Sequence, residues 1–274
     1  MIHVLYHSSC YDGFGAAFSA WRALGDDGVV YTPCSYDQKN APLEAVPDGS
    51  EVFVVDFSFK RDALVAASKR FSSLLVLDHH ASAEEDLRGL DFCTFDMKKS
   101  GAMLAWDFFH EGTPPPRLIE FIQDRDLWKF DYPETHAVHM GLLSLPMDFA
   151  VWDSLMDDDA LNKLAEEGEC MLRLMRQQVN NICSKVTMVE LEPGVKIPAC
   201  NTCLYFSEVP DRLLELYPDA PYAAYWSPFF KDGKPMAQWG LRSRKSGVDV
   251  SKVARLFGGG GHKPAAGFVR PGFF

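Results

Sequence analysis

The chain has 274 residues, of which 47% are hydrophobic and 24% charged, and its formal net charge is −11. This composition is typical of a globular protein with a substantial core, and its acidity disfavours binding of long nucleic acid, which needs a basic face. The seven scattered cysteines do not suggest a disulfide framework, and neither a basic leader nor an apolar run of membrane-spanning length is found, so we expect a cytoplasmic protein that binds no membrane.

In the first half of the chain, short apolar strands alternate with helical segments. The expected strands are apolar runs at residues 2–6, 28–32, 52–55, 74–77 and 91–95. The expected helices carry apolar residues at helical spacing, at about residues 14–24, 60–71, from 100 onward and 118–122. This alternation predicts an α/β domain with a mainly parallel sheet wound by right-handed crossovers.

Three of these strands are followed by residues of the types that bind metals. The residues are His7 and Asp12, then Asp56, and then Asp78, His79 and His80. Because the carboxyl ends of parallel strands lie along one edge of a sheet, we expect these side chains to converge. A mixed His/Asp set with a bridging carboxylate such as Asp56 suits Mn²⁺ or Mg²⁺ in a two-metal site better than structural zinc.

A further acidic cluster, Asp124-Arg125-Asp126, follows the helix predicted at 118–122. It is either a solvated helix end or the source of one more carboxylate for the metal edge. We favour Asp124 for this role and keep Asp126 as the alternative.

One long helix, predicted at about 160–185, separates the two halves of the chain and looks like a connector. The residues beyond it predict a smaller mixed α/β domain, with strands at 186–191, 195–199, 222–226 and 238–242 and helices at 210–216 and 249–256. The predicted organisation is therefore a metal-binding domain over 1–156, a connector over 157–186 and a second domain over 187–274.

The second domain ends with a glycine run that precedes His262 and Lys263. The four glycines are Gly258, Gly259, Gly260 and Gly261. Their amides could form an anion nest to which His262 adds a donor, although a flexible hinge is the alternative. Arg242, at the end of a predicted strand, could present its planar fork to a phosphate.

The Asp78-His79-His80 triplet, together with the Gly258–His262 run and Ala265-Ala266-Gly267, resembles two motifs of the DHH/DHHA1 phosphoesterase superfamily. That superfamily includes RecJ-type exonucleases, oligoribonuclease/pAp-phosphatase enzymes, cyclic dinucleotide phosphodiesterases and family II inorganic pyrophosphatases. The resemblance spans nearly the whole chain. It implies a DHH metal-binding domain, a connector helix and a smaller DHHA1 substrate-binding domain, with the active site in the cleft.

The resemblance also implies roles for individual residues. The implied metal ligands are His7, Asp12, Asp56, His79 and Asp124, of which Asp56 would be the bridging one. The implied cofactor is one or two Mn²⁺ ions, for which Mg²⁺ or Co²⁺ could substitute. Asp78 would be a ligand or an orienting carboxylate, and His80 would contact the scissile phosphate. Arg242, Gly259, Gly260, Gly261 and His262 would hold the rest of the substrate.

One position departs from the family pattern. Ser9 stands where related sequences have the first Asp of their first motif, so one metal position lacks an anionic ligand, with only Ser9, Cys10 or water nearby. We therefore expect a metal-dependent phosphoesterase acting on short oligonucleotides, dinucleotides or pAp-like nucleotides. The alternatives are an exopolyphosphatase or pyrophosphatase activity, or a weakened nucleotide sensor. A homodimer is a further expectation.

Overall fold

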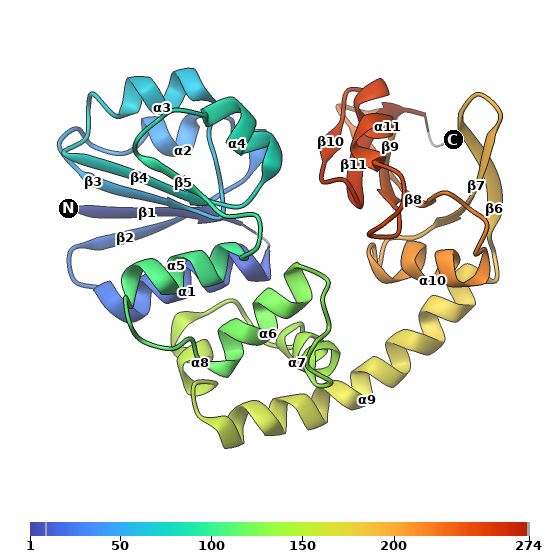
Figure 1. Cartoon of the computed structure of the whole chain (residues 1–274), viewed down its shortest axis with the longest axis horizontal. Coiled ribbons are helices and arrows are strands. Elements are labelled where there is room, and N and C mark those ends of the chain that lie inside the picture. Colours follow the sequence, from blue (N-terminus) through green and yellow to red (C-terminus); the bar gives the residue numbers. More distant parts are fainter. Residues whose placement is uncertain (9, 273–274) are drawn as a thin grey trace. The chain divides into compact units, whose positions relative to one another are not determined.

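The computed structural model describes residues 1–8 and 10–272, and the chain divides into two compact units, Met1–Leu172 and Arg173–Phe274 (Figure 1). The division falls inside helix α9 (Asp158–Cys183), which is the long helix expected at about 160–185. Its first half therefore belongs to the N-terminal unit and its second half to the C-terminal unit.

The sheet of the N-terminal unit is parallel, as predicted, with strand order β2-β1-β3-β4-β5. Its strands are β1 (Ile2–His7), β2 (Val29–Cys34), β3 (Glu51–Val55), β4 (Ser73–Asp78) and β5 (Cys93–Phe95). The order places β1, β3 and β4 side by side in the interior of the sheet. The residues that follow these three strands consequently meet at one edge.

Alternate side chains of these strands enter two different cores, one on each face of the sheet. Val4 and Val55 pack with α1 (Tyr11–Leu24) and α5 (Gly101–Phe109). Leu5 and Val54 pack on the other face, which is covered by α2 (Ala41–Glu44), α3 (Arg61–Ala67) and α4 (Ala81–Leu87) (Figure 1). Burial on both faces requires an apolar residue at every position, which explains the continuous apolar runs in the sequence.

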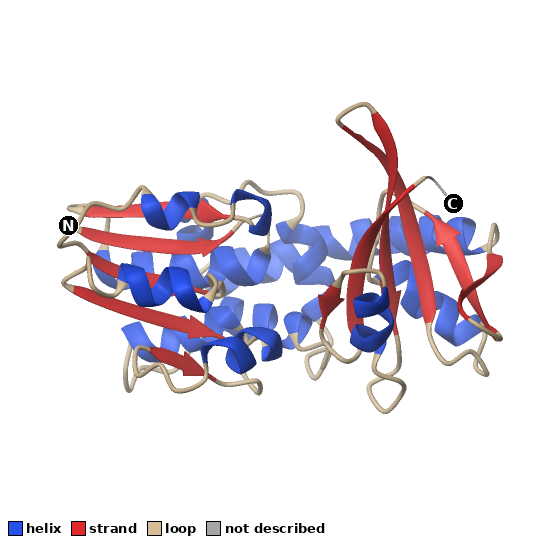
Figure 2. Ribbon diagram, turned by 90° about the horizontal axis from the view of Figure 1, so that it is seen from above, coloured by secondary structure: helices blue, strands red, loops and turns tan. Residues whose placement is uncertain are grey.

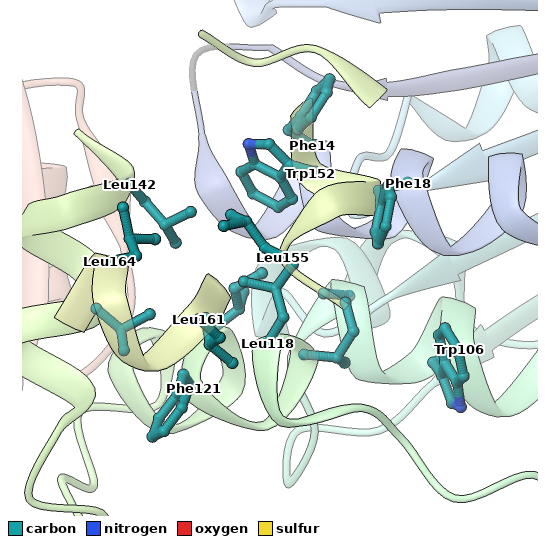
Figure 3. Packing of buried hydrophobic residues seen from close by; sticks show 14 of the residues in the cluster. Phe14, Phe18, Trp106, Leu118, Phe121, Leu142, Trp152, Leu155, Leu161 and Leu164 are labelled. Carbon is teal, nitrogen blue, oxygen red and sulfur yellow. The ribbon is translucent and has the colours of Figure 1, made fainter. Parts of the chain in front are cut away.

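Beneath α1 lies a helical layer of α6 (Arg117–Asp126), α7 (Thr135–Leu142), α8 (Phe149–Ser154) and the first half of α9. Its centre is Trp152, which is fully buried and contacts Phe14 edge to face at 4.7 Å between ring centroids (Figure 3). Short helices α4, α7 and α8 were not predicted, because each has fewer than nine residues and too little repeat to define a face.

The C-terminal unit is a mixed sheet of order β10-β11-β9-β8-β7-β6, in which β7 and β8 are parallel and the other neighbours antiparallel (Figure 2). Its elements are β6 (Thr187–Glu192), β7 (Val195–Asn201), α10 (Glu208–Leu216), β8 (Ala223–Lys231), β9 (Lys234–Arg242), α11 (Val250–Leu256), β10 (Gly260–Gly261) and β11 (Ala265–Pro271). The α/β fold class expected from the sequence is confirmed. In the described part of the chain no helix is both long and apolar enough to cross a membrane.

Candidate metal centre

The carboxyl edge of the parallel sheet brings together side chains that are far apart in the sequence. His7 ends β1, Asp56 follows β3, and His79 follows β4. His79 Nε2 lies 3.2 Å from Asp56 Oδ1 and 3.4 Å from Asp12 Oδ2. His7 Nδ1 lies 3.5 Å from Asp56 Oδ2. These four residues, expected to converge from their positions at strand ends, therefore form one cluster.

Within the described residues, the potential ligand atoms fall into overlapping groups whose members lie within 4.8 Å of one another. The groups are His7, Cys10 and Asp56; Asp56, His79 and His80; and Asp12, His79 and Asp126. Asp56 and His79 each belong to two of these groups. A carboxylate with this central position is suited to contact two cations at once.

The chemistry of the cluster fits a bound divalent cation. Asp56 is 1% exposed, and its Oδ1 accepts no well-formed hydrogen bond, as is also true of the buried His7 Nδ1. Burial, and then the neighbouring Asp12 carboxylate, raise the pKa of Asp56. The same two causes raise the pKa of Asp126 to about 8. Asp56 is thus a buried carboxylate beside a second buried carboxylate, Asp12, and such a pair is unfavourable unless a cation joins the two.

Asp12 lies in the first turn of α1 and points to the beginning of α5. Its Oδ2 accepts a hydrogen bond from Gly101 N at 2.6 Å, and its Oδ1 accepts one from Ala102 N at 2.9 Å. Burial by itself raises the pKa of Asp12, but hydrogen bonds from His79 and Ala102 outweigh burial and bring it below its ordinary value. The start of α5 thus fixes an ionised carboxylate in the cluster.

Two glycines let helices approach these ligands closely. A Cβ on Gly13 would lie 2.3 Å from His7 O, and a Cβ on Gly101 would lie 2.4 Å from Asp56 Cβ. Both contacts are shorter than any real Cβ contact, so a side chain at either position would displace α1 or α5 from the cluster.

Asp78 orients His80 and takes no part in the ligand groups among the described residues. Its Oδ1 lies 2.6 Å from His80 Nδ1, and its Oδ2 accepts a hydrogen bond from Ser58 at 2.5 Å. Burial by itself lowers the pKa of His80, but the Asp78 carboxylate outweighs burial and raises it. Asp78 was expected to be either a metal ligand or a carboxylate that orients His80. Its contacts are those of an orienting carboxylate.

Asp126, rather than Asp124, reaches the cluster. Helix α6 continues through both residues, and two positions along an α-helix turn the side chain by about 200°. Asp126 Oδ2 lies 3.7 Å from His79 Nε2. Asp124 faces the other way and accepts hydrogen bonds from Asp131 N, Tyr132 N and the Thr135 hydroxyl. The preference for Asp124 therefore does not agree with the geometry, because its oxygens are engaged at the start of α7.

Cys10 is the member of the cluster that the predicted ligand set omitted. It is the N-cap of α1, between His7 and Asp12, and its position in the first motif was the available signal. Burial, followed by the Asp56 and Asp12 carboxylates, raises the pKa of its thiol well above the ordinary value. Ser9, on which the expected shortage of ligands depended, lies outside the described residues.

A pocket opens next to the cluster inside the N-terminal unit. Its lining includes Ser58, which contacts Asp78, and the aromatic rings of Tyr36 and Phe57. Lys39 and Lys60 add two positive charges to this lining, and Asp86 adds one negative charge. In a chain of net charge −11 a pocket whose lining is net positive favours an anionic occupant.

The residues predicted to bind substrate from the second domain lie together in the C-terminal unit. Arg242 ends β9 and pairs with Ala265 of β11, directly beside the turn at His262. Gly260 and Gly261 form β10, which pairs with β11. These residues are therefore neighbours, although their role in binding stays a prediction.

The backbone contacts argue against an anion nest at two of the four glycines, Gly258 and Gly259. Gly258 N donates to Arg255 O, and Gly259 N donates to Ala254 O, so these two glycines close the end of α11. His262 N donates to Ala265 O across the turn. Since these amides already have acceptors, they are not free to cradle an anion.

Two solved structures share the fold of this chain. The pGpG-specific phosphodiesterase PggH from Vibrio cholerae matches with a TM-score of 0.53 at 14% identity, over 99% of this chain and 94% of PggH. RecJ from Thermus thermophilus, solved in complex with Mn²⁺, matches with a TM-score of 0.53 at 18% identity, over 97% of this chain and 49% of RecJ. The chain therefore has the fold of PggH and RecJ, as expected from motifs that resemble the superfamily to which RecJ-type exonucleases belong.

No family model matches the chain. Uncharacterized protein R106 of Acanthamoeba polyphaga mimivirus is 30% identical to it over 285 residues, which cover 98% of this chain and 67% of the viral protein. The chain therefore belongs to the same family as mimivirus R106.

Proposed function

We propose that this protein is a divalent-metal-dependent phosphohydrolase that cleaves phosphodiester or phosphoanhydride bonds of short anionic substrates. The observation that carries the proposal is the set of three ligand groups joined by Asp56 and His79, in which Asp56 Oδ1 and His7 Nδ1 are buried without a well-formed hydrogen bond. The fold shared with a pGpG phosphodiesterase and with Mn²⁺-bound RecJ supports the same class of reaction.

The residues of the cluster have two proposed roles, metal binding and interaction with the phosphoryl group. His7, Asp12, Asp56, His79 and Asp126 would hold the cations. The chemistry that divalent ions supply at such a set is polarisation of a phosphoryl oxygen and a lowered pKa of the attacking water. His80, whose pKa is raised by the Asp78 carboxylate, would donate a hydrogen bond from Nε2 to a phosphoryl oxygen or, when protonated, give a proton to the leaving oxygen.

The acidic surface and the small pocket favour short substrates over long nucleic acid. The lysines Lys39 and Lys60 would bind a phosphate of the substrate next to the reacting one, and Tyr36 offers an aromatic ring for a base. Arg242 and the Gly259–His262 segment stay candidates for contacts with the remainder. Short oligonucleotides, dinucleotides and pAp-like nucleotides agree with this set, and polyphosphate is the alternative without a base.

The test is product release from a panel of pApA, pGpG, pAp, cyclic dinucleotides and short polyphosphate, with Mn²⁺, Mg²⁺, Co²⁺ or Zn²⁺ added to metal-stripped protein. We expect turnover of at least one nucleotide that falls by roughly a hundredfold or more in Asp56→Asn, given that weaker perturbations of a metal site already cost 10–100-fold. Arg22→Gln, which alters a surface ion pair with Asp153, serves as a control that keeps full activity.

His80→Asn separates chemistry from binding in the same assay. We expect it to lower kcat by a larger factor than it weakens metal binding, because His80 Nδ1 is held by Asp78 although the ring also belongs to the group with Asp56 and His79. If no substrate is turned over with any metal while nucleotides bind, the protein is a nucleotide sensor and the hydrolase proposal is wrong. Release of phosphate from polyphosphate alone would assign the alternative activity.

A further inference from the structure

The side chain of Cys10 has the surroundings of a ligand. Its Sγ, a ring nitrogen of His7 and a carboxylate oxygen of Asp56 all lie within 4.8 Å of one another. The three residues come from different elements: the N-cap of α1, the end of β1 and the residue after β3. A cation placed between them would need only small side-chain movements to reach the usual bond lengths of about 2.0–2.3 Å.

Cys10 neither caps α1 with a well-formed side-chain hydrogen bond nor belongs to a hydrophobic core. The N-cap position is usually held by Ser, Thr, Asp or Asn, whose oxygen accepts a hydrogen bond from the first turn. Cys10 occupies this position without a well-formed bond of this kind, and the Gly13 amide near its thiol only partly offsets the effect of burial on the thiol pKa. Nor is Cys10 part of the hydrophobic core, unlike Cys34, which is fully buried in the cluster on the other face of the sheet. The thiol therefore faces polar side chains at the edge of the sheet.

A second, independent observation points to a ligand at this place. Asp56 is 1% exposed, and its Oδ1, which lies 3.2 Å from His79 Nε2, accepts no well-formed hydrogen bond within the described chain. His7 Nδ1 is also buried without one. Buried polar atoms are almost always satisfied in native proteins, so two such atoms on neighbouring residues mark the position of a missing partner. A cation satisfies the carboxylate, the imidazole and the sulfur together.

We propose that Cys10 is a thiolate ligand, and that His7, Cys10 and Asp56 form a site for a borderline metal such as Zn²⁺ or Co²⁺. The inference rests on the proposed function and refines it. Sulfur and imidazole select softer cations, whereas the set of Asp12, His79 and Asp126 is dominated by carboxylates and suits Mn²⁺ or Mg²⁺. The centre then has two unlike positions, which are linked through Asp56 and His79 in the third ligand group, and the sulfur supplies the negative charge that the family's first Asp would bring.

Binding exchanges one bond for another without oxidation. The Cys10 S–H bond breaks, a sulfur–metal bond forms, and the proton goes to solvent. The charge of the set becomes that of one thiolate and one carboxylate, which together neutralise a divalent ion.

Cobalt reports this ligand directly and without any substrate. Metal-stripped full-length protein titrated with Co²⁺ should develop a thiolate-to-cobalt charge-transfer band in the near ultraviolet, in addition to the weaker visible bands. Cys10→Ser should lose the charge-transfer band and keep the visible bands of cobalt bound elsewhere in the cluster. Cys34→Ser, which alters a cysteine at the end of the neighbouring strand β2, is the matched control and should keep both.

Zinc affinity provides the second measurement. We expect Cys10→Ser to weaken Zn²⁺ binding by roughly a hundredfold or more, because even loss of an outer partner of a ligand costs 10–100-fold. Cys10→Asp should restore a charged ligand while favouring Mn²⁺, so its ratio of Zn²⁺ to Mn²⁺ affinity should fall below that of the native protein. Circular dichroism and thermal melting confirm that both variants are folded.

The outcomes separate this inference from the proposed function. Cobalt bound without a charge-transfer band, or a band unchanged in Cys10→Ser, would overturn the role of Cys10 and leave a hydrolase with oxygen and nitrogen ligands. Failure of the native protein to bind Co²⁺, Zn²⁺ or Mn²⁺ at all would overturn both. Loss of the band in Cys10→Ser, with Mn²⁺-supported turnover absent, would support the thiolate site and count against hydrolysis alone.

Discussion

Asp56 combines three features that are unfavourable in a protein without bound metal. Its backbone adopts φ 52, a left-handed conformation that residues with a side chain rarely take. The side chain is almost completely buried, and burial together with Asp12 raises its pKa. Backbone strain of this kind costs about 1–3 kcal/mol and concentrates at functional sites. The residue is thus arranged for binding rather than for stability.

This view predicts opposite effects of one substitution on stability and on binding. Asp56→Asn should raise the unfolding free energy of the metal-free protein by on the order of 1 kcal/mol, because it removes a buried charge beside Asp12 at neutral pH. It should also abolish the rise in melting temperature that metal gives the native protein. Denaturant unfolding with chelator, and thermal melting with Mn²⁺ or Zn²⁺, measure the two effects. A less stable metal-free variant would contradict the assignment.

The two aspartates of α6 should respond in opposite ways. Asp124→Asn should lower the unfolding free energy by about 1–3 kcal/mol, since it removes an acceptor of hydrogen bonds from Asp131, Tyr132 and Thr135. It should leave metal affinity within a fewfold of the native value. Asp126→Asn should weaken metal binding and slightly stabilise the metal-free protein. Calorimetric metal titration and urea unfolding of both variants decide between the residues, and the reverse pattern would restore Asp124 as a ligand.

At the scale of elements, the glycine run joins α11 to β10 and β11. A Cβ on Gly259 would lie 2.1 Å from Gly267 O and 2.6 Å from Phe268 Cβ, whereas a Cβ on Gly260 meets no atom within 4 Å. Gly260 is also absent from the glycines with positive φ in the described chain. The two adjacent positions therefore differ sharply in what they tolerate.

We expect Gly259→Ala to destabilise the protein by about 1–3 kcal/mol, as overpacking does, and Gly260→Ala to leave stability unchanged. Since Gly260→Ala keeps the fold, any increase of its KM would report a contact with substrate. Thermal melting and steady-state kinetics of both variants make the comparison. Equal destabilisation by both would show that the hairpin packs differently.

Helix α7 contributes a dependence of stability on pH through His139. Burial first, and then Arg125 and His136, lower the pKa of His139 from 6.5 to about 3. As the pH falls below about 6.5, the unfolded chain takes up a proton that the folded chain refuses, so this residue lowers stability progressively from there to about pH 3. Above 6.5 the ring is neutral in both states and contributes no pH dependence.

His139→Gln should therefore lose less stability than the native protein as the pH falls through this window. Urea unfolding at a series of pH values measures the difference between the two proteins, which cancels the titration of groups that they share. A difference that does not change with pH would mean that the ring is accessible to protons in the folded state.

At the scale of the whole molecule, the proposed metal ligands all belong to one compact unit. His7, Asp12, Asp56, His79 and Asp126 lie within Met1–Leu172, and Arg173–Phe274 supplies no member of the ligand groups found among the described residues. Binding of metal should therefore stabilise the two units unequally.

Addition of metal at about a hundred times its dissociation constant should stabilise the native state by roughly 2.7 kcal/mol. Hydrogen exchange should slow at the ends of β1, β3 and β4 and at the start of α5, whose amides bond Asp12. Exchange in β6 to β11 should change little. Protection spread evenly over both units would show that the C-terminal unit takes part in holding the metal.

The sequence alone determined most of the architecture. The apolar runs before His7, Asp56 and Asp78 were strands because parallel strands buried on both faces need unbroken apolar residues. Parallel strands place their carboxyl ends at one edge of the sheet, so the sequence also predicted that His7, Asp12, Asp56 and His79 converge there. The helix α9 could also be predicted, because apolar residues that recur at helical spacing over 26 residues define an amphipathic face well.

Only the tertiary structure decided which neighbouring side chains enter the cluster. Asp126 replaces Asp124 because α6 runs through both residues and turns them to opposite faces, and the sequence did not fix where that helix ends. Cys10 joins His7 and Asp56 through the approach of α1 to β1, which depends on the absence of a side chain at Gly13. The amides of Gly258 and Gly259 have acceptors because they close the end of α11. Such contacts depend on helix phase and packing distance, which a local pattern of residues does not encode.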